Sequence, residues 1–380
     1  MSIAETFDMP VTRPLVPPSP PRAPDGMTAF ARMRAMSQSP INTWGRRAYE
    51  DDIVRGRFFG RSSFILNTPV DLREAMQRMT LEIAGRTMFS FGMERHGPTL
   101  RDFVMEYGER LAHPHFLDML LPLGWPSPQD FSRARFRKRW TQFVSQLMAE
   151  RRAAGKNEGA PPRDLFDLMG AARDPETGEA FSDEQLGDEV ATMILAGHET
   201  TATALFWALY LLALDPATQD AVAAEVTSTN VDGGLEIERL KFTRAVVDET
   251  MRLYPPAFLI ARAATAPDTI AGMAVKKNDI ILIAPWLLHR HEKLWHDPSA
   301  FVPARFMPPA PPPDRFAYLP FGVGARVCIG AHFALVEATL ALAKLIGAFR
   351  VELLDKEPVM PIGIVTTQPD RSPMFMISSR

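Results

Sequence analysis

Residues 183–214 are the part of the sequence that most constrains the fold, because they are long, mostly apolar and free of proline. Ser182 and Gln185 form the pattern of a capping box at the start, and Asp215-Pro216 follows the last residue. A helix of this length measures about 48 Å at 1.5 Å per residue. The sequence therefore predicts one long helix over residues 183–214.

The apolar part of this helix raises the question of a membrane span. Residues 190–214 are long enough to cross a bilayer, but His198 and Glu199 lie near their centre, where charge is costly in lipid. We expect a buried core helix that carries a functional acid, and no membrane span. Residues 1–26 lack the basic and apolar regions of a secretory signal peptide.

Composition narrows the class of protein further. The net charge is −3, from 42 Lys and Arg against 45 Asp and Glu, so no global basic field attracts nucleic acid. Cys328 is the only cysteine in the 380 residues, which excludes an intrachain disulfide framework and fits a reducing compartment. We expect a cytoplasmic protein with a proline-rich arm over residues 1–28 and a single domain over residues 29–380.

Most of the chain has helical patterns, and a smaller share has β-like runs. Helices are predicted over residues 40–50, 70–94, 131–155, 164–172, 183–214, 217–228, 238–254 and 330–347. A strand pair is predicted within residues 56–67, with short strands over 258–285 and in the C-terminal tail. The predicted fold class is mainly α with a small β region.

The residues around Cys328 form the motif with the clearest chemistry. We call residues 321–330, FGVGARVCIG, the cysteine loop. A zinc site needs four ligands and no second cysteine is available, while a nucleophilic cysteine needs a nearby base and none is local. The glycines indicate a tight loop close to a large flat group. The guanidinium group of Arg326 has paired N–H donors that can bind both oxygens of a carboxylate. Haem meets these needs together, and a buried structural cysteine remains the alternative.

The cysteine loop resembles the haem-binding loop of the cytochrome P-450 superfamily, F-x-x-G-x-R-x-C-x-G, at every fixed position. The matching residues are Phe321, Gly324, Arg326, Cys328 and Gly330. The resemblance implies a haem b cofactor, Cys328 as the axial ligand of its iron, and cofactor contacts from Phe321, Gly322, Arg326 and Gly330. A thiolate ligand pushes electron density to the iron and favours O–O cleavage.

A polar stretch, AGHETT, interrupts the long helix at residues 196–201. Gly197, Thr200 and Thr201 are poor helix formers, and the two hydroxyls can bond backbone carbonyls and open the helix ladder beside a metal. A zinc site of the H-E-x-x-H type is excluded because position 202 is alanine. A core helix with a satisfied polar patch remains the alternative. The stretch is similar to the P-450 motif [A/G]-G-x-[D/E]-T-[T/S], which implies proton delivery by Thr200 and Glu199 and places Gly197 at the cofactor.

Two further segments match the superfamily. Glu249 and Arg252 stand three residues apart on a predicted helix, a spacing that alone is typical of solvated surface pairs. In the superfamily, E-x-x-R and a later P-x-R-F form a buried cluster beneath the haem loop, which implies a structural role for Glu249, Arg252 and Arg305. Arg262 matches a propionate-binding arginine by position and residue type. We expect the histidines of residues 288–296 to lie in a surface turn, with a metal cluster as the alternative.

The resemblance also indicates a shortened chain. Residues 40–67 resemble the first helix and strand pair of the superfamily, and residues 70–380 follow its later order, but the helices between them are missing near residues 66–70. One of those helices supplies basic residues to the haem propionates in the superfamily, and a loop there lines the substrate pocket. A natural deletion, a gene-model error and a degenerate member all remain open.

The expected activity is that of a monooxygenase, which inserts one oxygen atom of O₂ into an apolar organic substrate and reduces the other to water. Gly322 and Gly324 begin a G-x-G-x-x-G pattern, the fingerprint of dinucleotide binding, but position 327 is valine and the pattern is incomplete. No other nicotinamide or flavin fingerprint occurs in the sequence. We expect electrons from a separate ferredoxin- or flavodoxin-type donor with its reductase. The alternatives are a truncated P-450-like protein with impaired haem binding and no catalysis, and peroxide-driven oxygen transfer.

Overall fold

The computed structural model describes residues 53–58, 61–66, 70–90, 95–107, 111, 128–153, 162–229, 237–270, 272–363 and 365–380. The chain divides into two compact units, Met1–Pro69 and Val70–Arg380, and each is described by itself. The predicted arm over residues 1–28 and the predicted helix over 40–50 lie outside the described residues. The single domain over residues 29–380 stays a prediction.

A β-hairpin is the described part of the first unit. Strand β1 (Ile53–Phe58) pairs antiparallel with strand β2 (Arg61–Leu66), and Ile53 is opposite Leu66 while Phe58 is opposite Arg61. This hairpin confirms the strand pair predicted within residues 56–67. The next strand, β3 (Val70–Asp71), opens the second unit, so the shortening near residues 66–70 stays a prediction.

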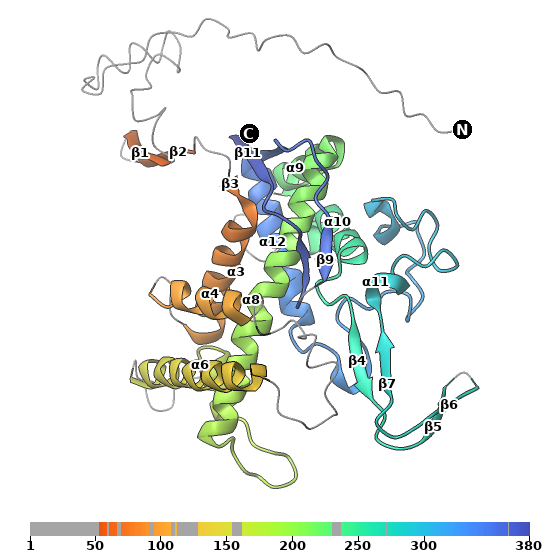
Figure 1. Ribbon diagram of the computed structural model, residues 1–380. Coiled ribbons are helices and arrows are strands. Elements are labelled where there is room, and N and C mark those ends of the chain that lie inside the picture. The colour runs from red at the N-terminus through yellow and green to blue at the C-terminus, as the bar shows by residue number, and fades with distance from the viewer. Residues whose placement is uncertain are drawn as a thin grey trace, which may run out of the picture. The chain divides into compact units, whose positions relative to one another are not determined.

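Helix α8 (Asp183–Leu214) runs through the centre of the second unit (Figure 1). The predicted capping box is present, because the Gln185 amide donates to the Ser182 Oγ at 3.2 Å and the Ser182 amide donates to the Gln185 Oε1 at 2.8 Å. The long helix is therefore confirmed at both ends. The expected opening of its ladder is wrong, because α8 is continuous from Asp183 to Leu214.

Three helices enclose α8: α3 (Leu72–Phe89), α10 (Lys241–Leu253) and α12 (Ala331–Ala348). The other helices in the described part of the chain are α4 (Gly97–Glu106), α6 (Pro128–Ala153), α7 (Leu165–Ala171), α9 (Pro216–Thr229) and α11 (Pro285–Leu288). Its short 3₁₀ turns are η3 (Ile237–Arg239), η4 (Pro303–Phe306) and η5 (Gly324–Arg326). The sequence patterns did not predict α4.

Small antiparallel sheets account for the β part, as the fold class predicted. Strands β3, β11 (Met374–Ser379) and β8 (Phe349–Leu353) form a three-stranded sheet with β11 in the middle. The two-stranded sheets are β4 (Ile260–Ala263) with β7 (Ile280–Ile283), β5 (Asp268–Ile270) with β6 (Met273–Val275), and β9 (Pro361–Gly363) with β10 (Thr367–Pro369).

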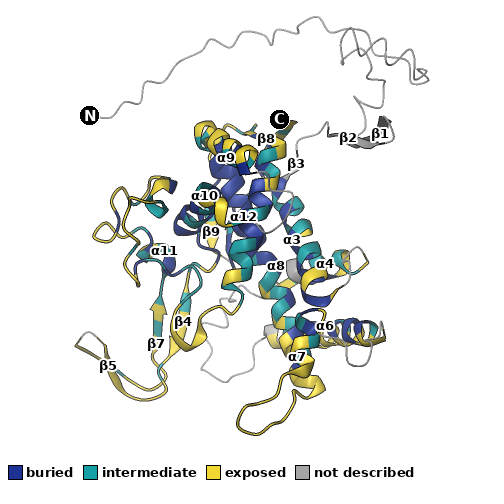
Figure 2. Cartoon of the chain, turned by 180° about the vertical axis from the view of Figure 1, so that it is seen from behind, coloured by how far each residue is buried: buried dark blue, intermediate teal, exposed yellow. Residues whose placement is uncertain are grey.

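Burial divides α8 into two parts (Figure 2). Residues 201–212 are buried at every position, and Trp207 stacks on Tyr254 with ring centroids 4.1 Å apart. The first three residues of α8, 183–185, are exposed. The apolar segment predicted to be a core helix is confirmed as one. Among the described residues, one helix, α12, is long and apolar enough to cross a membrane, but it packs against α8, α9 and α10 in the same core.

Candidate functional site

The cysteine loop takes a shape that only glycine adopts easily. Gly322 and Gly324 have φ angles of +71° and +80°, in the left-handed region. The Cys328 amide donates to the Phe321 carbonyl at 2.9 Å and closes the loop. Gly330 differs, because its φ is −85° and an added Cβ would make only an ordinary contact at 3.9 Å with the Cys328 Sγ. The chain itself therefore requires glycine at two positions of the loop.

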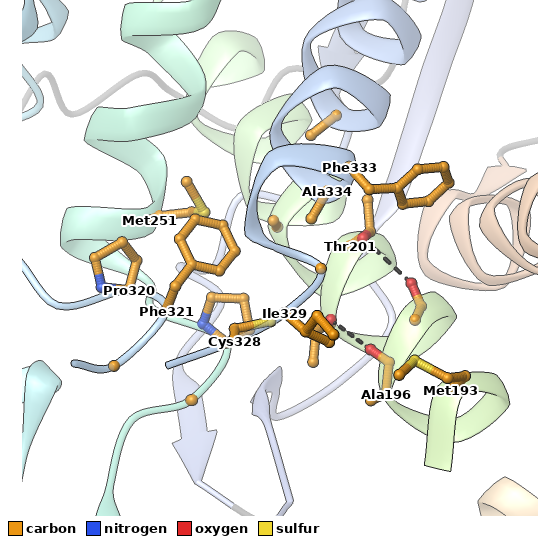
Figure 3. Close-up of a pocket in the computed structure, with 18 of the residues that line it drawn as sticks. Met193, Ala196, Thr201, Met251, Pro320, Phe321, Cys328, Ile329, Phe333 and Ala334 are labelled. Atoms are coloured by element: carbon orange, nitrogen blue, oxygen red, sulfur yellow. Dashed lines mark hydrogen bonds between the residues drawn. The ribbon is translucent and has the colours of Figure 1, made fainter. Parts of the chain in front are cut away.

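Cys328 lies at the wall of a cavity of about 310 Å³, which we call the cysteine pocket. The cysteine loop forms one side, and residues of α3, α8, α10, α12 and β4 line the rest. Figure 3 shows the loop beside α8 and α12. The Cys328 thiol is exposed and has no disulfide partner. The alternative of a buried structural cysteine does not hold, and a sulfur ligand is available to a group in the pocket.

Helix α8 lines the pocket with Ala196, Gly197, Thr200 and Thr201 of the AGHETT stretch. The Thr200 hydroxyl donates to the Ala196 carbonyl at 2.8 Å, and the Thr201 hydroxyl donates to the Gly197 carbonyl at 3.3 Å (Figure 3). An added Cβ at Gly197 would lie 3.0 Å from the Cε of Met88, which also lines the pocket. The small residue at 197 thus lets α3 approach α8 beside the pocket.

Glu199 is adjacent to Thr200 in sequence but does not line the pocket. Its buried carboxylate accepts hydrogen bonds from the Gln77 side-chain amide of α3 at 2.9 Å and from the Gln368 side-chain amide of β10 at 3.1 Å. The structure therefore brings Thr200 to the pocket with Cys328 but turns the Glu199 carboxylate toward α3 and β10. Proton delivery by Glu199 stays a prediction.

Two guanidinium groups line the cysteine pocket, those of Arg262 and Arg326. Arg262 donates to the carbonyl of its neighbour Ala261 at 2.9 Å. Arg326 makes no hydrogen bond or ion pair with any residue that the structure describes. A haem fits this set of groups: one thiol, a largely apolar wall that includes Phe321, and two cations for its carboxylates.

The three residues of the predicted ion-pair cluster bond to one another. Glu249 and Arg252 have fully buried side chains, and Arg252 binds both carboxylate oxygens at 2.7 and 2.8 Å. Arg305 donates to Glu249 Oε1 at 3.3 Å and is 13% exposed, and the Val302 amide donates to the same oxygen at 2.8 Å. Glu249, Arg252 and Arg305 are thus bonded to one another, and their structural role beneath a haem loop stays a prediction.

His289 corrects the prediction for residues 288–296, because it is fully buried and does not lie in a surface turn. Its Nε2 accepts the Leu319 amide at 2.8 Å, and its Nδ1 therefore carries the proton toward the Arg252 carbonyl at 3.2 Å. The pKa of His289 is lowered to about 4, chiefly by burial and in part by the charges of Arg252 and Arg290. His291 and His296 are exposed, so these histidines do not converge.

Glu337 of α12 is a buried acid that the sequence analysis missed. It is 6% exposed, and burial raises its pKa to about 7, an effect that Thr201 of α8 opposes. A signal was available in the sequence, because Glu337 is the only charged residue between Ala331 and Leu342. A single acid in an apolar helix next to the cysteine loop indicates a buried carboxyl group, which is rare in proteins.

Comparison with known proteins gives the family. The family description "Cytochrome P-450" matches residues 61–372. Cyclooctatin synthase of Streptomyces melanosporofaciens is 33% identical over 341 residues, which cover 87% of this chain and 72% of the relative. Cyclooctat-9-en-7-ol 5-monooxygenase of the same organism is 31% identical over 330 residues, covering 84% and 70%. A bifunctional cytochrome P-450/NADPH–P-450 reductase of Bacillus subtilis is 32% identical over 307 residues, covering 75% of this chain and 27% of that protein.

The chain belongs to the cytochrome P-450 family. Its cofactor is a haem iron group, and its activity is that of a haem-thiolate monooxygenase, which uses electrons from a redox partner. The cysteine pocket is the only place in the described residues where a cysteine thiol meets a cavity of this size.

The ion-pair cluster generates a prediction about stability. We expect Glu249→Gln to lower the free energy of unfolding by about 3–5 kcal/mol, because it leaves the buried guanidinium group of Arg252 and the partly buried one of Arg305 without their counter-ion. Arg244→Gln, in the half-exposed Arg244–Asp248 pair of the same helix, is the matched control and should cost less than about 1 kcal/mol. Urea denaturation of both variants measures the difference, and equal costs would contradict the structural role.

His289 generates a prediction about pH. Its pKa is about 4 in the folded chain and about 6.5 when unfolded, so the unfolded state binds more protons between these values and stability falls as the pH falls. We expect this residue to remove about 2 kcal/mol between about pH 7.5 and about pH 5. His289→Gln, which stays neutral, should show a shallower decrease in urea denaturation. Parallel pH profiles for the two proteins would show that His289 is not the cause.

Proposed function

We propose that this chain is a haem b monooxygenase of the cytoplasm, with Cys328 as the axial ligand and Arg326 and Arg262 as partners of the haem carboxylates. The observation that carries the proposal is the exposed Cys328 thiol at the wall of the cysteine pocket, opposite Thr200 and Thr201 of α8. The bound haem supplies the activation of O₂ and the thiolate push toward O–O cleavage. Phe321, Gly322, Gly330 and Gly197 complete the proposed cofactor contacts.

The chain's own residues have three tasks in this proposal. The positive-φ glycines hold the cysteine loop flat enough to present Cys328. The Thr200 hydroxyl, which donates to the Ala196 carbonyl at rest, exchanges that bond for one to a water or oxygen atom in the pocket and holds a proton there. Glu199 is proposed to act one step behind Thr200, through the water that the pocket admits.

The substrate proposed is an apolar organic molecule. Met193, Ala196, Ile260 and Phe333 line the pocket, and such side chains offer contact area without hydrogen bonds. One relative is by its name a monooxygenase of cyclooctat-9-en-7-ol, and we extend only the apolar character to this chain. A separate ferredoxin- or flavodoxin-type donor with its reductase is proposed to supply the electrons, since the sequence has no nicotinamide or flavin fingerprint.

Replacement of Cys328 tests the cofactor assignment. The chain is expressed with haem precursor, reduced and exposed to carbon monoxide, and the unmodified protein should give the red-shifted Soret band of thiolate-ligated haem. Cys328→Ser should abolish this band. An unchanged band in the variant would refute the ligand, while its absence from the unmodified protein would favour the truncated, inactive alternative.

Thr200 is tested by coupling between electron use and product. Thr200→Ala removes the hydroxyl that holds a proton in the pocket, so a larger share of the electrons should appear as hydrogen peroxide. Thr192→Ala, whose exposed hydroxyl bonds the Asp188 carbonyl on the same helix, is the matched control. Both are assayed for product and peroxide per electron pair, with a surrogate donor and an apolar substrate that shifts the haem spectrum. Coupling that survives in Thr200→Ala would overturn this role.

A further inference from the structure

A run of cations on α6 has no part in the site described above. Residues 131–142 contain five basic side chains and no acid, in a chain whose net charge is −3. The five are Arg133, Arg135, Arg137, Lys138 and Arg139. Like charges three or four residues apart on a helix repel one another, so such a run is more stable when an anion lies near it.

The packing of α6 leaves this run on the outside of the helix. Phe136 and Trp140 are buried and contact Phe103 of α4 with ring centroids 5.6 and 5.4 Å apart. Helix α6 also packs across α8 (Figure 1). One face of α6 is thus fixed in the core of the second unit, while Arg135 and Lys138 are exposed.

Only two of the five cations have an acid nearby. Arg139 pairs with Glu106 of α4, and Arg133 lies 3.6 Å from Asp130. The other three are exposed and form no hydrogen bond or ion pair with any residue that the structure describes; they are Arg135, Arg137 and Lys138. These three charges are therefore available to an anion from outside the chain.

An exposed aromatic ring shares the surface with these cations. Phe131 is 83% exposed, and it stands four residues before Arg135 and seven before Lys138, so the three side chains lie on one face of the helix. We call Phe131, Arg135, Arg137 and Lys138 the α6 surface. An acidic protein would account for its cations but not for its ring.

A hollow of about 570 Å³ adjoins the α6 surface. Its described lining includes Asp130, Arg133, Arg137, Lys138, Thr141 and Gln142. The three cations, the hydroxyl and the amide of this lining are donors for phosphate oxygens, and the charge of the one acid, Asp130, is balanced by Arg133 at 3.6 Å. The hollow therefore suits the phosphate group of a lipid head.

We propose that the α6 surface attaches this chain to a membrane that contains anionic phospholipids. The ring of Phe131 enters the boundary between headgroups and acyl chains, and Arg135, Arg137 and Lys138 bind the phosphates with their long side chains. The attachment is peripheral, because the opposite face of α6 stays buried in the protein.

Membrane attachment would serve the supply of substrate. Apolar organic molecules leave water for the bilayer, so an enzyme held at the bilayer surface meets them at a higher concentration. This use of the α6 surface rests on the proposed function. The attachment itself goes beyond that function and does not depend on haem.

Cosedimentation with vesicles tests the attachment. The full chain, with and without haem, is mixed with vesicles of phosphatidylcholine that contain or lack phosphatidylglycerol. It should sediment with the anionic vesicles and not with the neutral ones. Raising the salt from about 0.1 M to about 1 M should release most of it, because the Debye length falls from about 10 Å to about 3 Å. Since the haem-free chain is included, the result stands even if the carbon monoxide spectrum refutes the proposed function.

Two triple variants test whether the α6 cations carry the binding. The α6 variant combines Arg135→Gln, Arg137→Gln and Lys138→Gln, and the control variant combines Lys241→Gln, Lys293→Gln and Lys344→Gln. Both remove three exposed cations, so the net charge changes equally. The α6 variant should bind anionic vesicles roughly a hundredfold more weakly, because each cation near the surface strengthens binding about fivefold. The control variant should bind like the unmodified chain.

The ring is tested separately by Phe131→Ser. This variant keeps every cation, so it should keep the preference for anionic vesicles but bind them roughly tenfold more weakly.

Three results would overturn the proposal. The first is an unmodified chain that binds anionic and neutral vesicles equally or binds neither. The second is an α6 variant that binds like the control variant. The third is an α6 variant that loses affinity for an acidic ferredoxin and keeps its affinity for vesicles, which would assign the surface to a protein partner.

Discussion

The guanidinium group of Arg252 is the interaction on which the loop region depends, because it is fully buried and all five of its N–H donors are used. Two bonds go to Glu249, and three go to the carbonyls of His289, Pro298 and Ala300 at 2.7–2.8 Å. A buried charge that is paired and fully hydrogen-bonded is stable, whereas the same charge with one bond missing is not. The chain between residues 289 and 302 is therefore fixed to α10 by polar contacts.

From this anchor the constraint passes to the cysteine loop through a neutral histidine. His289 donates to the Arg252 carbonyl and accepts the amide of Leu319, two residues before the loop begins. Tyr318 adds a second connection, because its hydroxyl donates to the Asp248 carbonyl of α10 at 2.9 Å. Cys328 itself is exposed, so the loop is held from behind and presents its sulfur to the pocket. Protonation of His289 would remove its acceptor and loosen this connection.

Local signals explain what the sequence predicted well. The ends of α8 follow from a capping box and a proline, and both depend on residues within one turn of the helix end. The cysteine loop needs positive φ at Gly322 and Gly324, and this need is also local. The burial of His289 and Glu337, and the direction of Glu199, depend on which distant elements pack against them. Gln368, for example, stands 169 residues from the carboxylate that it binds.

Two glutamates near the pocket show how packing assigns different chemistry to the same side chain. Glu199 is an acceptor of two amide hydrogen bonds, so α3 and β10 fix its carboxyl group in place. Glu337 is packed among apolar groups of α8 and α12 without such donors, so burial favours its protonated form.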